Sequence, residues 1–131
     1  MADAVSEVRK VIEDWVAAVK RRDLEAVLHR HATDIVMYDV PPPFQSRGIK
    51  AYRNAWDGFF AGLREPTAFD IREMEVVAGE DVAFVYAAMR CAGREAVGDD
   101  IDLDFRLTIG LRRIVGQWTI VHEHHSVPVE A

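Results

Sequence analysis

The sequence predicts an α+β domain in which three N-terminal helices cover one face of a curved antiparallel sheet, so that the sheet forms a cone. Two observations favour this class. Residues 4–63 carry three helical patterns with one strand between the second and the third, and residues 68–127 carry four consecutive strand patterns. The 131 residues are enough for one core and too few for two. We therefore expect a single domain over residues 1–131, with a pocket at the wide end of the cone.

The helical patterns are set by apolar spacing and by residues that begin or end a helix. Apolar side chains recur every three or four positions between Val8 and Val19, which predicts a first helix over about residues 4–21. Asp23 can cap a short second helix. The third helix begins at Ile49 and is ended by Pro66. Its inner face is rich in aromatic residues: Tyr52, Trp56, Phe59 and Phe60.

The strand patterns differ in how many of their faces are apolar. A first strand over residues 35–40 is ended by three prolines, which cannot donate to a ladder. The later strands cover about residues 68–78, 81–93, 101–114 and 117–127. Residues 101–111 alternate, as expected for a strand with one buried face, whereas residues 82–89 are apolar on both faces. This second pattern predicts that another subunit covers the convex face of the sheet, as in a homodimer.

The last strand carries histidines two residues apart. Side chains alternate along a strand, so Trp118, Ile120, His122 and His124 are expected on one face and Thr119, Val121, Glu123 and His125 on the other. An apolar wall would then lead into two imidazoles at the pocket. Two alternatives stay open: an exposed strand end, or buried histidines that bind a backbone or carboxylate group.

Composition excludes several classes of protein. The net charge is −6, with acidic and basic residues interspersed, which argues against a nucleic-acid partner. The sequence contains no run of 18 apolar residues, which a membrane-spanning helix would need. The N-terminus lacks the pattern of a secretory signal and Cys91 is the only cysteine, so we expect a cytoplasmic protein. Phosphate-binding loops, serine elbows and Cys-x-x-Cys motifs are absent from the sequence.

Several segments resemble one known family. They are Trp15-Val-Ala-Ala-Val, Arg22-Asp-Leu-Glu, Tyr38-Asp-Val-Pro, the helix start from Gly48 to Tyr52, Asp104-Phe-Arg, and the stretch from Trp118 to Ser126. Over essentially its whole length the chain resembles the nuclear transport factor 2-like superfamily, in the branch of SnoaL-like polyketide cyclases and ketosteroid isomerase homologues. The resemblance implies a cystatin-like, nuclear transport factor 2-like fold. Function stays open, because this fold hosts isomerases, cyclases, dehydratases, hydrolases and modules without catalysis.

The resemblance also suggests roles for single residues. The aspartate that shuttles the proton in ketosteroid isomerases corresponds to Asp39, which could otherwise be a turn residue ahead of Pro41. The two oxyanion donors of those enzymes correspond to Trp15 and Leu103. An indole N–H is a weakly acidic donor and leucine donates nothing. Since the loss of one such donor costs about a hundredfold in rate, steroid isomerisation is not expected.

These observations lead to two hypotheses. In the first, the protein binds a small apolar carbonyl compound and moves a proton without a cofactor, as an isomerase, cyclase or dehydratase does, with Asp39 as base and His122 as acid or oxyanion donor. No metal is expected, because His-x-His alone is a weak signal. In the second, the protein is a homodimeric binding or assembly module whose aromatic residues fill the cavity. The residues expected to line the pocket are Trp15, Tyr38, Trp56, Phe60, Leu103, Phe105 and His124.

Overall fold

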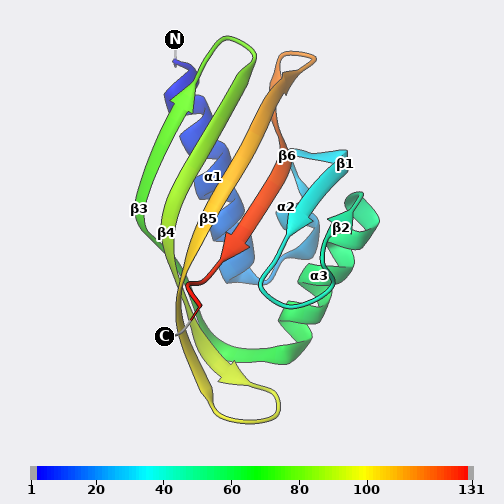
Figure 1. The fold of residues 1–131 in the computed structure, drawn as a ribbon, viewed down its shortest axis with the longest axis vertical. Helices are drawn as coiled ribbons and strands as arrows, with labels where there is room; N and C mark the ends of the chain where they lie inside the picture. The colour runs from blue at the N-terminus through cyan, green and yellow to red at the C-terminus, as the bar shows by residue number, and fades with distance from the viewer. Residues whose placement is uncertain (1–2, 130–131) are drawn as a thin grey trace.

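A six-stranded sheet with three helices on its inner face forms the protein (Figure 1). The computed structural model describes residues 3–129, apart from the side chains of residues 65–67. The helices are α1 (Ala4–Arg21), α2 (Leu24–Leu28) and α3 (Ile49–Gly62). The strands are β1 (His31–Tyr38), β2 (Ser46–Arg47), β3 (Leu63–Ala78), β4 (Val82–Glu95), β5 (Asp100–Ile114) and β6 (Gln117–Ser126).

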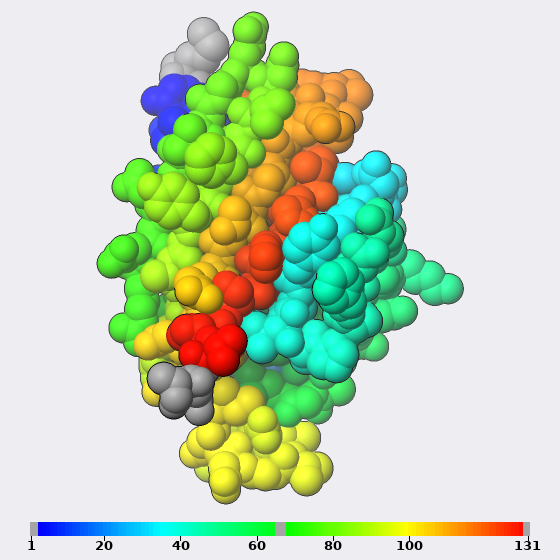
Figure 2. All heavy atoms as spheres, in the orientation of Figure 1, coloured from blue at the N-terminus to red at the C-terminus, as the bar shows by residue number. Residues whose placement is uncertain are grey.

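The order of strands across the sheet is β2-β1-β6-β5-β4-β3. Every neighbouring pair is antiparallel except β1 and β6, which run parallel. The predicted α+β class is confirmed, with this one parallel pair as a departure from an antiparallel sheet. Two register shifts in β3 bend the long strands, so the sheet curls around the helices (Figure 1). The tip of the β4–β5 hairpin projects from the body of the molecule (Figure 2).

Two of the helices begin at a capping aspartate, and the cap at Asp23 was predicted from the sequence. Asp3 accepts a hydrogen bond from the backbone N–H of Ser6 at 2.7 Å at the start of α1, and Asp23 accepts one from Ala26 at 3.2 Å at the start of α2. The helix α3 ends at Gly62, a few residues before Pro66. The buried side of α1 supplies much of the core, with Val8, Ile12, Trp15, Val16, Ala18 and Val19.

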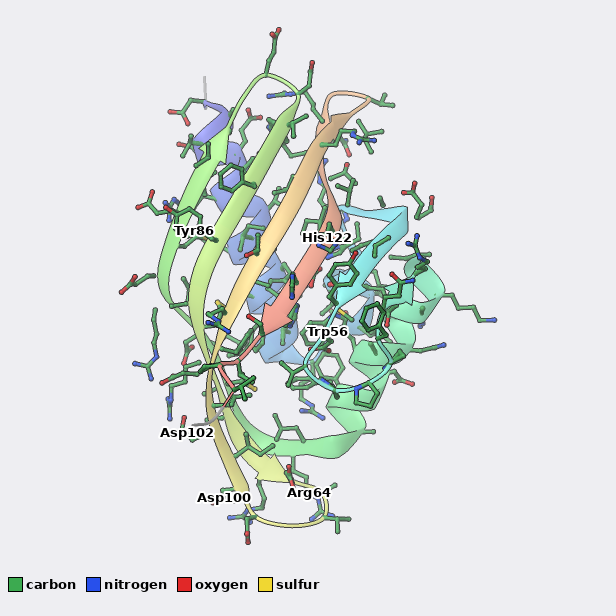
Figure 3. The ribbon with its side chains drawn as sticks, in the orientation of Figure 1. Trp56, Arg64, Tyr86, Asp100, Asp102 and His122 are labelled. Atoms are coloured by element: carbon green, nitrogen blue, oxygen red, sulfur yellow. The ribbon has the colours of Figure 1, made fainter. Side chains whose placement is uncertain are left out.

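The strand β4 has apolar side chains on both faces, as predicted. Its inner residues are buried against the helices, whereas Phe84 and Tyr86 lie exposed on the outer face with their rings stacked at 6.3 Å. Tyr86 is labelled in Figure 3. The homodimer that this face suggested stays a prediction.

A bulge in β6 changes which of its side chains face the helices. Leu111 of β5 pairs with Ile120, but the next residue of β5, Gly110, pairs with His122, so Val121 has no partner in the ladder. One extra residue in a strand reverses the alternation beyond it. Trp118 and Ile120 are therefore buried before the bulge, and Glu123 and His125 after it. The prediction that His122 and His124 face the pocket is wrong for this reason.

The strand β1 shows a similar irregularity before its end. Its register against β6 shifts between His31 and Val36. Met37 is buried, whereas Tyr38 points to the outer face, where its ring lies 4.8 Å from that of His122 and 5.3 Å from that of His124. Tyr38, His122 and His124 thus form an aromatic group on the outer face, away from the pocket, and the predicted role of Tyr38 in lining the pocket is wrong.

Within residues 3–129, none of the helices is long and apolar enough to cross a membrane.

Candidate functional site

A pocket of about 480 Å³ lies between the inner face of the sheet, α3 and the loop that follows β1. Its wall is mostly apolar, and its polar side chains are Asp39, Ser46, Cys91 and His125. Lysine and arginine are absent from the described residues that line it. Figure 3 shows Trp56, which projects from α3 behind the loop between β1 and β2. The apolar lining consists of Met37, Val40, Pro41, Pro42, Pro43, Ala55, Trp56, Gly58, Phe59, Phe69, Ile101, Leu103 and Phe105.

The imidazole of His125 is held among aromatic rings. Phe105 stacks on it with ring centroids 5.7 Å apart and planes 17° apart. Trp15 and Trp56 approach it edge-on or tilted, at 6.4 and 6.3 Å. Aromatic contacts on several sides restrict the rotamers of a side chain, so the ring of His125 has a fixed orientation at the pocket wall.

A buried carboxylate, that of Glu123, lies behind His125. Its Oε1 accepts a hydrogen bond from Nε2 of His125 at 3.1 Å. Its Oε2 accepts from the hydroxyl of Tyr52 at 2.5 Å and lies 2.9 Å from Nε2 of His31. The indole N–H of Trp15 donates to the hydroxyl oxygen of Tyr52 at 3.0 Å. The carboxylate is therefore solvated by protein donors alone, which satisfies the requirement that a buried charge be paired and hydrogen-bonded.

The hydrogen bonds decide the charge of Glu123. Burial raises the pKa of its carboxyl, but the hydrogen bonds and charges of His125 and His31 outweigh burial and lower the pKa from 4.5 to about 2. Conversely, burial and the charge of Glu123 raise the pKa of Tyr52 well above its ordinary value, so this phenol stays protonated and donates. Both ring nitrogens of His31 face oxygen atoms, because Nδ1 lies 2.8 Å from the carbonyl oxygen of His29.

Asp39 lies on the pocket side of His125. Its Oδ1 is 3.8 Å from Nδ1 of His125, which is too long for a direct hydrogen bond. The same oxygen accepts from the backbone N–H of Val40 at 2.8 Å, as a turn aspartate does. Burial lowers the pKa of His125, but hydrogen bonding to Glu123, its charge and the charge of Asp39 raise the pKa overall. The pocket wall thus presents a carboxylate beside an imidazole that readily holds a proton.

The structure brings only part of the predicted site together. Asp39, Trp56, Leu103 and Phe105 line the pocket as expected. Trp15 is not among the residues that line the pocket, and its indole N–H donates a hydrogen bond to the hydroxyl of Tyr52. Phe60 packs on Trp56 with ring centroids 6.0 Å apart but is not part of the pocket wall, where Phe59 takes the place expected for it.

His122 lies outside the pocket, although it was predicted to be the acid partner of Asp39. Its Nδ1 donates a hydrogen bond to the carbonyl oxygen of Val36 at 2.6 Å, on the side of the sheet opposite the pocket. Sequence reasoning missed His125, Glu123, Tyr52 and His31. The cluster His122-Glu-His-His125 signalled polar chemistry at this strand, but no residue in it marks the bulge that selects Glu123 and His125.

Across residues 3–129, with the side chains of residues 65–67 left aside, no group of three or more His, Cys, Asp or Glu side chains is placed to hold a metal ion.

Comparisons with known proteins agree with this architecture. An NTF2-like protein of unknown function from Pseudomonas putida KT2440 is 35% identical, with a TM-score of 0.87 over 97% of this chain and 88% of that one. A ketosteroid isomerase-like protein from Erwinia carotovora atroseptica is 20% identical, with a TM-score of 0.82 over 98% of this chain and all of that one. A protein of unknown function with a cystatin-like fold from Nostoc punctiforme is 13% identical, with a TM-score of 0.77 over 93% and 89%.

No curated protein matches the chain. The family model of the SnoaL-like domain matches residues 8–130, nearly the whole sequence. Together with the relative from Pseudomonas putida, this match shows that the chain belongs to the SnoaL-like family of the nuclear transport factor 2-like superfamily.

Proposed function

We propose that this protein is a cofactor-independent enzyme that moves a proton on a small apolar carbonyl compound. Asp39 is the base and His125 is its acid partner, in the role that the sequence had suggested for His122. The observation that carries this proposal is the placement of Asp39 Oδ1 and His125 Nδ1 3.8 Å apart at one wall of an aromatic pocket.

The two groups have complementary roles. Asp39 is partly exposed at the pocket wall, and its carboxylate oxygens can accept a proton from the carbon next to a carbonyl group. His125 holds its Nε2–H toward Glu123, and its raised pKa favours a second proton on Nδ1. This N–H can donate to the carbonyl oxygen as negative charge develops on it.

The reaction supported by this arrangement is an enolisation. The C–H bond beside the carbonyl breaks, its proton passes to Asp39, and the electron pair forms the carbon–carbon double bond of the enol. Nδ1 of His125 stabilises or protonates the oxygen. Where the substrate carries a second carbon–carbon double bond conjugated with the enol, return of the proton from Asp39 to the far carbon of that double bond gives an isomer; otherwise its return to the same carbon gives only exchange. In both cases His125 recovers its own proton from the enol oxygen, so both groups end as they began.

Glu123 is a positioning residue in this proposal. Its hydrogen bond to Nε2 leaves Nδ1 as the nitrogen of His125 that faces Asp39. Its negative charge also favours the imidazolium form. Because Glu123 is itself held by Tyr52 and His31, the imidazole keeps one orientation when the pocket is empty, which reduces the cost of reorganisation during the reaction.

The lining of the pocket argues against ligands that carry a carboxylate or a phosphate group. A volume of about 480 Å³ accommodates a molecule of two or three fused rings. A ligand carboxylate or phosphate would meet no lysine or arginine among the described lining residues and would lie near Asp39. Burying such an unpaired charge is costly.

The test uses 2-tetralone, an uncharged bicyclic ketone, in deuterated buffer, with exchange of its α-protons followed by proton NMR. We expect the protein to accelerate exchange and the Asp39→Asn and His125→Asn variants to lose roughly a hundredfold of that rate, as removal of a general acid or base does. The matched controls are Asp34→Asn, at an exposed position of β1, and His122→Asn, outside the pocket. An Asp39→Asn protein with the full exchange rate would overturn the assignment of the base.

A second candidate function is a homodimeric binding module without catalysis. The exposed outer residues of β4, Val82, Phe84 and Tyr86, favour it, because monomeric proteins rarely leave such rows uncovered. The two functions differ in one outcome of the same assay. A binding module holds 2-tetralone, detectable by quenching of tryptophan fluorescence, without accelerating the exchange of its protons.

A further inference from the structure

One polar side chain of the pocket, that of Ser46, takes no part in the proposed reaction. Asp39 and His125 are assigned to proton transfer, and Cys91 is a weak donor whose pKa burial raises to about 11. Ser46 remains, on β2 just before α3, and it was not among the residues predicted to line the pocket. Its position and its hydroxyl group both point to a ligand.

The backbone holds Ser46 on the inner face of the sheet. The short strand β2 is an edge strand beside β1 (Figure 1). Ser46 lies directly opposite the buried Met37 of β1, and side chains that are opposite each other in a ladder point to the same face. The next residue, Arg47, is exposed, as the alternation requires. The N–H of Gly48 then donates to the carbonyl oxygen of Ile35 at 2.7 Å, which fixes the end of β2.

The hydroxyl of Ser46 has no partner among the described residues. Only 8% of the residue is exposed, and its hydroxyl makes no hydrogen bond with any residue that the structure describes. In the same part of the chain, the side-chain polar atoms that are both unpartnered and sealed from solvent are the indole nitrogens of Trp56 and Trp118. The hydroxyl of Ser46 is therefore not sealed, and the space beside it is the pocket that the residue lines.

This hydroxyl is of no use to the fold itself. A buried hydroxyl without a partner is more costly than a methyl group of similar size, so alanine would serve the strand better than Ser46 does. A ligand oxygen in the pocket can supply the missing partner, because a serine hydroxyl both donates and accepts.

The ladder also sets the distance from Ser46 to the reacting pair. Asp39 stands two positions beyond Met37, the partner of Ser46, and it lines the same pocket. Residues in this diagonal relation have Cβ atoms roughly 7–8 Å apart. A fused bicyclic molecule spans such a distance, so one ligand can place a carbonyl group at Asp39 and a second oxygen at Ser46.

We propose that Ser46 determines the specificity of the pocket, and that the substrate is a ketone with a second, neutral oxygen at the end away from its reacting carbonyl. The second oxygen belongs to a hydroxyl or a carbonyl group, which bonds to Ser46. A ketone that lacks it leaves the serine unpaired and binds less tightly. This inference rests on the proposed function for the reacting carbonyl, but it concerns binding and not proton transfer.

The experiment is isothermal titration calorimetry with 6-hydroxy-2-tetralone and with 2-tetralone, which lacks the second oxygen. We expect the unaltered protein to bind the hydroxylated ketone about fivefold more tightly, as one neutral hydrogen bond predicts. Ser46→Ala should remove this preference and leave the affinity for 2-tetralone unchanged. The matched control, Ser6→Ala at an exposed position of α1, should keep the preference.

Equal affinities of the unaltered protein for the two ketones would overturn the proposal, as would the absence of binding by both. A preference that survives in Ser46→Ala, or an equal loss of affinity for both ketones in that variant, would also overturn it, because a structural role affects both ligands alike. The comparison on the unaltered protein decides the matter even if Ser46→Ala folds poorly.

The proposed function is judged separately, by proton exchange. A preference for the hydroxylated ketone that depends on Ser46, without any acceleration of exchange, would refute the enzyme and support the role of Ser46. Accelerated exchange without such a preference would do the reverse.

Discussion

The substitution Glu123→Gln tests the buried carboxylate network directly. Glu123 is fully buried and takes hydrogen bonds from Tyr52, His31 and His125. An amide in its place keeps the shape of the side chain but removes the negative charge. The amide of glutamine has only one oxygen, and its N–H₂ group then faces a hydrogen-bond donor of Tyr52, His31 or His125, so at least one of these donors loses its acceptor.

The magnitude follows from the pKa of the carboxyl. A pKa lowered from 4.5 to about 2 by folding corresponds to about 3 kcal/mol of stability at neutral pH. The general cost of removing one partner from a buried ion pair is about 3–5 kcal/mol, which agrees in size. For a typical urea dependence of about 2 kcal/mol per molar, the unfolding midpoint should fall by roughly 2 M.

The assay is urea unfolding at pH 7, monitored by tryptophan fluorescence. The matched control is Glu75→Gln, an exposed glutamate on β3, which should change the free energy of unfolding by less than about 0.5 kcal/mol. If Glu123→Gln lowers the free energy of unfolding by less than about 1 kcal/mol, the network does not carry the stability that we assign to it.

The remaining predictions concern pH, packing and association. The pKa of Glu123 is lowered in the folded state, so this group stabilises the fold above pH 4.5, and that stabilisation is lost as the pH falls toward 2. The pKa of His125 is raised in the folded state, so this group stabilises the fold at acidic pH, and that stabilisation is lost as the pH rises through its raised pKa. Urea midpoints should therefore peak between about pH 4.5 and 6.5, and a steady rise to pH 9 would contradict this. Trp15→Phe removes the donor to Tyr52 and should cost about 1 kcal/mol in the same unfolding assay, whereas an unchanged midpoint would show that this hydrogen bond is dispensable. Burial raises the pKa of Cys91 to about 11, so dithionitrobenzoate at pH 8 should label this thiol slowly. Because Cys91 lines the pocket, bound 2-tetralone should slow the labelling further, whereas rapid labelling would mean an open pocket. Tyr86→Asp should convert a dimer into a monomer in light scattering, and a monomeric unaltered protein would refute the dimer.

Most of the fold could be predicted from the sequence because its signals are local. The apolar spacing of α1, the cap at Asp23 and the alternation of β5 each depend on neighbouring residues. The parallel pairing of β1 with β6 was not predicted, because it joins segments about 90 residues apart and leaves no local pattern.

The candidate site was predicted only in part, for the same reason. Asp39, Trp56 and Phe105 were placed correctly, since each follows from the position of its own element. The choice between His122 and His125 was wrong, because it depends on whether one residue of β6 drops out of the ladder with β5.

The sequence by itself determined the α+β class, the positions of the helices and long strands, and the presence of an acidic residue and histidines near an aromatic pocket. These features follow from the period of apolar residues and from the residue types at element ends. Only the tertiary structure decided which histidine meets Asp39 and that Glu123, Tyr52 and His31 support it. The reason is that a single unpaired residue, Val121, reverses the faces of the strand beyond it, and pairing across strands, not local sequence, decides where such a residue lies.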